Sequence, residues 1–435
     1  MLAAVAAAHS AFGGLSADLR AGLEADDEWR SRFQREEQRA AQAFRKHLRT
    51  INSPRDCRKA PLYVFTPYAF RSGIGSVLRA LSNALLQASA AGRTFVVDSS
   101  VYTNHFVSPL RCPERGHECL FRPVSTCTLA DAFPELPPEV VAANATELVA
   151  SLPKGPLQHS HDRPQQEHEY GPRVVATRTS CFKTASQEIR FTPREHSALA
   201  AEHLGARWYI TQAVAYLTRP NEALQLVTVH LAKTLSLDAT SRYVSVHIRR
   251  GDKGSEAALH PTEVYADVIR NISAERHIDR VLLASDDKNA YEELPALLPD
   301  RFRVDYIPHA AWAMPPGEGK AAAAVIVANK YASPAAATAN AKTAKALGDD
   351  APPFDEGQLL LAQAQLLAAG SVVVATLTSN YALLVHDLAA ERKQTAWPDF
   401  FDLDGNEPYP CHAREKAPFG PQYGQPVRTG PAVSE

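Results

Sequence analysis

Charged side chains crowd the segment 249–256, which directly follows an apolar run. Within eight residues the segment holds two arginines, an aspartate, a lysine and a glutamate: Arg249, Arg250, Asp252, Lys253 and Glu256. Arginine suits phosphate oxygens because its planar guanidinium group forms paired, charge-assisted hydrogen bonds. The residue types therefore predict an anion-binding site with a candidate base, Glu256, beside it. The alternative is a solvated charged loop after a strand, since structural ion pairs use the same residue types.

The run before these charges predicts the strand that positions them. Between positions 243 and 248, the β-branched side chains at 244, 246 and 248 alternate with Tyr243, Ser245 and His247. This is the period of a half-buried strand. Ligands of open α/β sheets bind beyond the carboxyl ends of the strands. We therefore expect His247 and the charges after it to lie beside a ligand.

Three more polar turns follow short apolar runs. The run 62–65 leads to a turn with Gly73 and Gly75, 281–284 leads to Asp286 and Asp287, and 372–375 leads to Thr378 and Ser379. Each turn has two interpretations. The glycines could present the N–H groups of a helix start to a diphosphate, or could serve only a tight turn. The aspartates could hold a metal or a nucleotide-sugar, or cap a helix that begins near Lys288; Thr378 and Ser379 could bind phosphate or cap the next helix.

The order of these segments predicts the fold class. Beyond position 53 the chain repeats a short β-rich run, a polar turn and a helical stretch, which indicates parallel sheets with crossover helices. The glycine turn matches neither the dinucleotide fingerprint nor the P-loop. Four polar turns at strand ends, divided between two halves of the chain, favour a cleft enzyme that uses a diphosphate ligand. A nucleotide-sugar transferase is the class that fits.

Length and charge set further bounds. A chain of 435 residues exceeds the size of one hydrophobic core, so we expect two domains with appendages. The 46 basic and 48 acidic residues nearly cancel, which disfavours recruitment of nucleic acid or of an anionic membrane. No apolar run approaches the ~20 residues of a membrane-spanning helix, and the alanine-rich start lacks the basic flank of a signal peptide.

The cysteines and two sequons give weak compartment signals. Six cysteines and the sequons at Asn144 and Asn271 fit a secretory compartment. No cysteine pair has the CxxC spacing, which disfavours a cysteine metal centre.

Several segments are predicted to lie outside the repeated units. Residues 15–48 have helical apolar spacing, typical of a stem, a packing arm or an ordinary peripheral helix. Residues 109–193 show little periodicity and predict a long irregular excursion. The alanine-rich segment 315–353 predicts a poorly ordered insertion.

The block at 244–265 also resembles the signature of the α1,6-fucosyltransferases, the enzymes that add core fucose to N-glycans. Blocks at 53–60, 121–128, 207–220 and 280–287 resemble successive blocks of the same family in the same order. The block at 374–380 resembles its last nucleotide-contacting turn. With interruptions, the similarity covers positions 53 to 430.

The resemblance implies an α/β, GT-B-like fold with two facing Rossmann-like halves and an N-terminal helical stem. We assign the stem to 1–52, an open-sheet α/β half with the long irregular loop to 53–240, and an extended tail to 406–435. The Rossmann-like donor-binding half would span 241–405 and contain the insertion. The implied donor is GDP-fucose, with no metal and no other cofactor.

Roles for the charged segment also follow from the resemblance. His247 would contact the guanine side of the nucleotide and Arg249 the β-phosphate, with Arg250 and Asp252 shaping the site. In an inverting transfer the leaving GDP gains negative charge, which Arg249 would stabilise. Glu256 would take the proton of the acceptor hydroxyl, coupled to Lys253, which keeps the carboxylate ionised.

Other matching positions would complete the donor pocket. Gly73 and Gly75 would line the diphosphate, and Tyr265 would support the site. The residues that would close the pocket are Asp286, Asp287, Thr378 and Ser379.

Three features depart from the family pattern. Two residues separate Lys253 from Glu256 where the family has three, which would displace the base. The ungapped match to the family aspartate that binds guanine is Gln363, although Asp355 would serve if a gap falls nearby. Nothing resembles the SH3-like domain that follows the catalytic region in animal relatives, which leaves the core-fucose acceptor open.

The family also has a disulfide where this chain has Cys57 and Cys127. The resemblance therefore predicts a Cys57–Cys127 bridge and leaves Cys112–Cys119 open as a second pair.

The resulting hypothesis is an inverting transfer of L-fucose from GDP-fucose to an N-glycan core GlcNAc in α1,6 linkage. Alternatives are another acceptor, another GDP-sugar, or a non-catalytic protein that binds glycans or nucleotides. The expected partners are a GDP-sugar and a glycan or glycoprotein, without nucleic acid, and the stem could support a homo-oligomer. By resemblance the location would be the Golgi or the secretory-pathway lumen.

Overall fold

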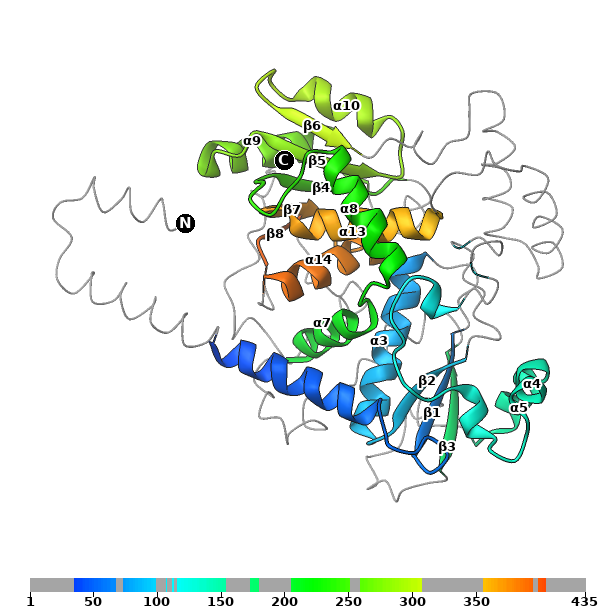
Figure 1. The fold of residues 1–435 in the computed structure, drawn as a ribbon. Coiled ribbons are helices and arrows are strands. Elements are labelled where there is room, and N and C mark those ends of the chain that lie inside the picture. Colours follow the sequence, from blue (N-terminus) through cyan, green and yellow to red (C-terminus); the bar gives the residue numbers. More distant parts are fainter. Residues whose placement is uncertain are drawn as a thin grey trace, which may run out of the picture.

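A computed structural model describes residues 35–67, 73–98, 107, 112, 116–153, 173–179, 205–250, 259–306, 355–393 and 398–403. They form two parallel β-sheets with a layer of helices between them (Figure 1). The predicted α/β class with parallel sheets is confirmed.

The smaller sheet has the strand order β2-β1-β3, and both pairings are parallel. Its strands are β1 (Leu62–Pro67), β2 (Thr94–Val97) and β3 (Val174–Thr179). Helix α3 (Ile74–Ala90) connects β1 to β2. The connection from β2 to β3 carries η1 (His117–Cys119), η2 (Leu129–Ala132), α4 (Pro138–Ala143) and α5 (Ala145–Ser151). The prediction of an irregular excursion over 109–193 is therefore wrong for these elements.

The larger sheet has the strand order β6-β5-β4-β7-β8, again all parallel. Its strands are β4 (Val244–Ile248), β5 (Arg280–Ser285), β6 (Arg303–Tyr306), β7 (Val372–Ala375) and β8 (Phe400–Asp402). Its helices are α9 (Thr262–Arg276), α10 (Ala290–Leu297), α13 (Glu356–Ala369) and α14 (Asn380–Arg392). The chain runs outward from β4 through β5 and β6, then returns to β7 on the other side of β4. The strand order thus reverses between β4 and β7, where open α/β sheets bind their ligands.

Strand β4 is buried on both faces, so the expectation of a half-buried strand is wrong. The alternation itself is confirmed, because the β-branched face packs into one apolar cluster and Tyr243 into another. The polar face is covered by α13: the Tyr243 hydroxyl donates to Leu366 O at 2.6 Å, and Ser245 donates to Leu367 O at 2.6 Å. These bonds satisfy carbonyls at the end of α13 that have no partner within the helix. A Cβ on Gly370 would lie 2.2 Å from Ser245 Oγ, so only glycine allows this approach.

The helical layer joins the two halves. Helices α7 (Gly205–Leu217) and α8 (Glu222–Thr234) pack with α3, α13 and α14 in one continuous apolar cluster. A buried polar contact crosses this layer: Asp387 of α14 lies 3.6 Å from Arg79 of α3 and accepts a 3.0 Å bond from Thr211 of α7. The side chain of Asn380 donates to Ser76 Oγ at 2.9 Å. The start of α14 is therefore fixed against the start of α3.

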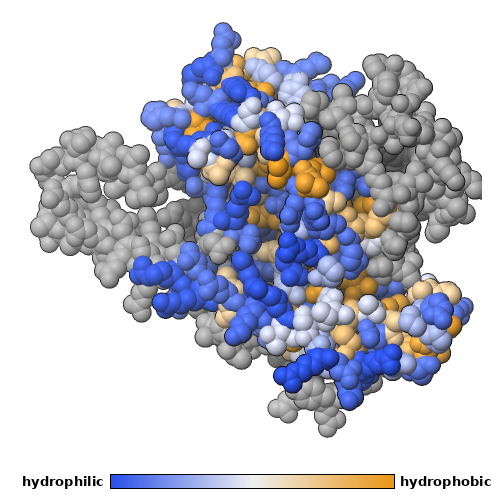
Figure 2. Space-filling view, viewed as in Figure 1, coloured by the Kyte–Doolittle hydropathy of each residue, from blue (hydrophilic) through white to orange (hydrophobic). Residues whose placement is uncertain are grey.

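The helix over 35–51 packs along the lower edge of the molecule in Figure 1. Its apolar face buries Phe44 and Leu48 completely, and the Phe44 ring meets Tyr209 edge-on at 5.2 Å. Its outer face is hydrophilic (Figure 2). Within the described part of the chain, no helix is both long and apolar enough to cross a membrane.

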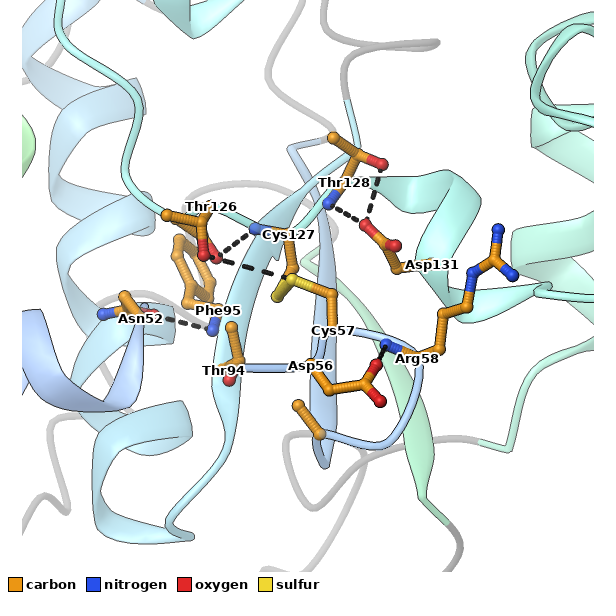
Figure 3. Close-up of a disulfide and its surroundings, with 12 residues drawn as sticks. Asn52, Asp56, Cys57, Arg58, Thr94, Phe95, Thr126, Cys127, Thr128 and Asp131 are labelled. Carbon is orange, nitrogen blue, oxygen red and sulfur yellow. Dashed lines mark hydrogen bonds between the residues drawn. A yellow bond between two sulfur atoms is a disulfide. The ribbon is translucent and has the colours of Figure 1, made fainter. Parts of the chain in front are cut away.

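Among the described residues there are two disulfides: Cys57–Cys127, which confirms the prediction, and Cys112–Cys119, which the sequence had left open. Figure 3 shows Cys57–Cys127, which ties the segment before β1 to the loop before η2. Beside it, Asn52 accepts a bond from Phe95 N of β2 at 2.8 Å and, through its carbonyl, one from Thr126 N at 2.9 Å. The bridge therefore lies among hydrogen bonds that hold the same loop against the sheet.

Candidate functional site

The candidate site lies at the carboxyl ends of β4, β5 and β7, where the strand order reverses. Parallel pairing places Ile248 opposite Ser285, so the residues after each strand emerge side by side. The sequence-predicted residues Arg249, Arg250, Asp286 and Asp287 are brought together here.

Arg249 forms an ion pair with Asp286. The other oxygen of that carboxylate accepts a 2.8 Å hydrogen bond from the backbone N of Arg250. Asp286 thus holds the end of β4 against the end of β5. The Arg249 side chain is 27% exposed, so its guanidinium group remains accessible to an anion.

Arg250 contacts protein groups from three elements. Its Nη1 lies 3.2 Å from Asp287 Oδ2 and 2.9 Å from Glu293 Oε2, and its Nη2 donates to Thr262 Oγ1. Burial lowers the pKa of Arg250, but hydrogen bonds to Glu293 and Asp287 outweigh it and raise that pKa overall. This side chain fastens α9 and α10 to the loop after β5. Arg250 therefore holds the loop after β5 in place, and a contact between Arg249 and a ligand stays a prediction.

His247 is 5% exposed, and its ring packs against Tyr381 with centroids 4.9 Å apart. Burial, with a smaller effect from the charge of Arg249, lowers the pKa of His247 to about 3. The imidazole is therefore neutral at physiological pH. Its Nδ1 has no hydrogen-bond partner among the described residues.

Gln363 of α13 is also buried beside Tyr381. The Tyr381 hydroxyl lies 3.2 Å from Gln363 Oε1 and donates to Leu360 O at 2.8 Å. Asp355, the other candidate for this position, instead caps α13 in a capping box with Gln358. The structure thus connects Gln363 to His247 through one tyrosine.

The glycine turn is at the first residues of α3. Gly73 is the N-cap residue, and a Cβ there would meet nothing within 4 Å. A Cβ on Gly75 would lie 2.4 Å from Asn380 O, so this glycine is required by the contact between α3 and α14. Neither interpretation made from the sequence anticipated that contact.

The helix-capping alternatives hold for part of the other turns. Ser379 is the N-cap of α14 and accepts a bond from Ala382 N at 3.5 Å. Asp287 accepts a bond from Asn289 N at 3.0 Å just before α10, while its other oxygen contacts Arg250. Thr378 lies in the turn after β7, and Tyr265 is buried on α9 in the core beneath β4. Roles for these residues in ligand binding stay predictions.

Three predicted residues, Asp252, Lys253 and Glu256, lie outside the described residues. In the described ranges, no group of three or more His, Cys, Asp or Glu side chains could hold a metal ion.

The sequence interpretation missed three side chains of the site: Thr262, Glu293 and Tyr381. Thr262 and Glu293 share a hydrogen bond in addition to their contacts with Arg250. No local sequence pattern distinguishes Thr262 and Glu293 from other residues of their helices. Tyr381 directly follows the polar turn 376–380, and its position beside that turn was the only available signal.

A comparison with protein families supports the resemblance. Residues 192–302 match the family model described as the alpha-(1,6)-fucosyltransferase N- and catalytic domains. That segment contains His247, both arginines and both aspartates of the site. The predicted resemblance is confirmed over this segment. No curated protein sequence matches the chain.

Solved structures with a similar fold include NodZ alpha-1,6-fucosyltransferase soaked with GDP-fucose, which is 14% identical with a TM-score of 0.39. That alignment covers 75% of this chain and 92% of NodZ, a protein of Bradyrhizobium. A mutant of Arabidopsis thaliana FUT1 in complex with GDP is 12% identical with a TM-score of 0.42, covering 76% of this chain and 68% of that one. POFUT1 in complex with GDP is 12% identical with a TM-score of 0.38, covering 79% and 98%.

Proposed function

We propose that this protein, whose residues 192–302 match the catalytic domain of α1,6-fucosyltransferases, is an inverting fucosyltransferase that uses GDP-fucose. The proposed acceptor is the core GlcNAc of an N-glycan, with α1,6 linkage. The two disulfides support a location in the secretory pathway.

One observation carries the proposal. The family match spans the end of β4 and the loop after β5; the end of β4 lies at the reversal of strand order, and the loop after β5 lies beside it. Sequence family and topology thus point independently to the same group of side chains.

Arg249 is the residue proposed to stabilise the leaving diphosphate. In the absence of donor its charge is balanced by Asp286. A β-phosphate would replace or share that carboxylate partner, and the guanidinium group would then neutralise the charge that develops as the fucose bond breaks. Because Arg250 is committed to Asp287 and Glu293, its proposed part is to hold the loop that carries Asp286.

The remaining chemistry is assigned to residues of the charged segment. Glu256, coupled to Lys253, is proposed to accept the proton of the acceptor hydroxyl while that oxygen attacks the anomeric carbon from the face opposite GDP. Asp252 would shape the loop between them. Other donor contacts are proposed for His247, Gln363, Gly73, Gly75, Tyr265, Asp286, Asp287, Thr378 and Ser379. The proposed reaction uses no metal, so transfer should survive treatment with a chelator.

Transfer assays test the function. The wild-type protein, incubated with GDP-fucose and a biantennary N-glycan, should add one deoxyhexose, detected by mass spectrometry. Arg249→Ala should lower kcat/KM by about 10²–10³-fold, the usual cost of losing a charge-stabilising donor. Arg301→Ala removes an exposed arginine paired with Asp279, away from the site, and should retain activity.

The outcomes separate the alternatives. Transfer to a different glycan, or from a different GDP-sugar, would correct the proposed acceptor or donor. The protein would still be a glycosyltransferase. Binding of GDP without transfer or donor hydrolysis would favour a non-catalytic nucleotide-binding protein. Full activity of Arg249→Ala would remove that arginine from the mechanism.

A further inference from the structure

Two buried polar groups of the candidate site lack a protein partner. His247 Nδ1 and Gln363 Nε2 have no hydrogen-bond partner in the described part of the chain, and their side chains are 5% and 4% exposed. Buried polar groups are almost always hydrogen-bonded. Two such unpartnered atoms near the ends of β4 and β7 indicate a place for a ligand that has its own donors and acceptors.

Tyr381 contacts both residues that carry these unpartnered atoms. Its ring packs on His247, and its hydroxyl contacts Gln363. The residue as a whole is only partly buried, so this cluster extends from the protein interior to the surface. Burial of the hydroxyl raises the pKa of Tyr381, with a smaller contribution from Tyr291, so the group keeps its proton at physiological pH.

The single hydroxyl proton determines how the amide of Gln363 is oriented. Tyr381 gives that proton to Leu360 O, the nearer acceptor at 2.8 Å, and therefore has only lone pairs left for Gln363 at 3.2 Å. An amide oxygen facing those lone pairs is repelled, whereas an amide nitrogen donates to them. Rotating the amide by half a turn satisfies both groups. The carbonyl oxygen then occupies the unpartnered end.

We propose that Tyr381 is a positioning residue that fixes the Gln363 amide with its carbonyl oxygen towards the base of the bound nucleotide. The inference rests on the proposed function and names a specificity device for the same site. A fixed acceptor prefers a base edge rich in donors. Guanine carries N–H donors at its N1 and 2-amino positions, whereas adenine has an acceptor at N1. The Tyr381–Gln363 pair thus favours GDP over ADP.

The test compares two tyrosines whose hydroxyl groups donate to the same helix. Tyr381 donates to Leu360 O and Tyr243 donates to Leu366 O, both in α13, but only Tyr381 contacts Gln363 and His247. Calorimetry with GDP and ADP gives the ratio of the two dissociation constants. Tyr381→Phe should reduce that ratio by about tenfold, since one hydrogen bond of discrimination is lost. Tyr243→Phe should lower the melting temperature and leave the ratio unchanged.

Repeating the Tyr381→Phe change in a Gln363→Glu variant tests whether the effect comes from the orientation of the amide. Gln363→Glu replaces the two-ended amide with a carboxylate whose oxygens are both acceptors, so no positioning residue is needed. Adding Tyr381→Phe to Gln363→Glu should therefore leave the ratio of dissociation constants within about twofold of the single Gln363→Glu variant.

Each outcome has a distinct meaning. If wild-type protein binds GDP in preference to ADP and Tyr381→Phe keeps that preference, the positioning role is wrong while the proposed function stands. An equal loss in the Gln363→Glu background would also contradict the orientation argument. If wild-type protein binds neither nucleotide, the proposed function and this inference both fail.

Discussion

The two halves of the molecule are held together by different means. The smaller sheet has three strands, and both disulfides of the described chain lie in the segments around it. The larger sheet has five strands, with central strands buried on both faces and a group of arginine–carboxylate contacts at its carboxyl edge. Both halves bury their central strands, but the described disulfides lie around the smaller sheet and this group of charged contacts lies at the larger one. Most candidate site residues belong to the second half, where the contacts that stabilise the fold also shape the site.

The lengths of the connections explain this difference. The described part of the connection from β2 to β3 contains only short helices, so closing it costs more chain entropy than a compact crossover helix does. The Cys57–Cys127 bridge spans 70 residues of sequence and constrains that part of the unfolded chain. In the larger sheet, α9 and α13 both pack directly against β4.

Removing the disulfides tests this contrast and has the largest expected effect. Chain-entropy arguments give about 4 kcal/mol for a bridge across 70 residues and about 2 kcal/mol for the Cys112–Cys119 bridge across 7. The double variant Cys57→Ala/Cys127→Ala should therefore lower the free energy of unfolding by about twice as much as Cys112→Ala/Cys119→Ala, as measured by urea denaturation. Equal losses would mean that the long loop keeps its structure without the bridge.

Each half also contains a buried histidine whose pKa is lowered, His117 in the first and His247 in the second, and acid should affect both. Burial lowers the pKa of His117 to about 4 and that of His247 to about 3, from an unfolded value near 6.5. Since the unfolded chain binds the proton first, stability falls as pH drops below 6.5, down to about 4 for His117 and about 3 for His247. Between pH 7 and pH 5 each histidine should cost about 2 kcal/mol.

Urea denaturation at both pH values measures this loss. His117→Gln and His247→Gln should each reduce the pH-dependent loss by about 2 kcal/mol, whatever their stability at pH 7. If one variant keeps the full loss, that histidine does not cause the acid sensitivity of its half.

The local sequence predicted the elements whose signals are short-range. Strand β7 has the predicted bounds, and the alternation along β4 placed Ser245 and His247 on one face. The sequence could not show that α13 covers this face, because the bonds from Tyr243 and Ser245 reach carbonyls more than 120 positions away. Strand β3 was missed because it lies within 109–193, a stretch whose sequence shows little periodicity.

The same distinction applies to the candidate site. The meeting of Arg249 with Asp286 follows from parallel strands that end at one edge of the sheet, so it could be anticipated. The contact between Tyr381 and Gln363 depends on how α14 docks against α13, for which the sequence carries no local signal. Gly75 is similar: its neighbour Asn380 is 305 positions later in the chain.

The two glycines of α3 provide the smallest expected effect and separate packing from ligand binding. Gly75→Ala places a Cβ 2.4 Å from the backbone oxygen of Asn380, so α3 and α14 must move apart at a cost of about 1–3 kcal/mol. Gly73→Ala meets nothing within 4 Å and keeps an allowed backbone conformation, so unfolding should change by less than about 0.5 kcal/mol.

Calorimetry with GDP on the Gly73→Ala and Gly75→Ala variants then tests whether this turn binds the diphosphate. If Gly73 lines the diphosphate as proposed, Gly73→Ala should weaken GDP binding while the melting temperature stays unchanged, because the methyl group would occupy space used by the ligand. Gly75→Ala should lower the melting temperature whether or not GDP binds there. Unchanged GDP affinity in Gly73→Ala would mean that α3 only joins the two halves. The diphosphate would then be bound by residues of the larger sheet alone.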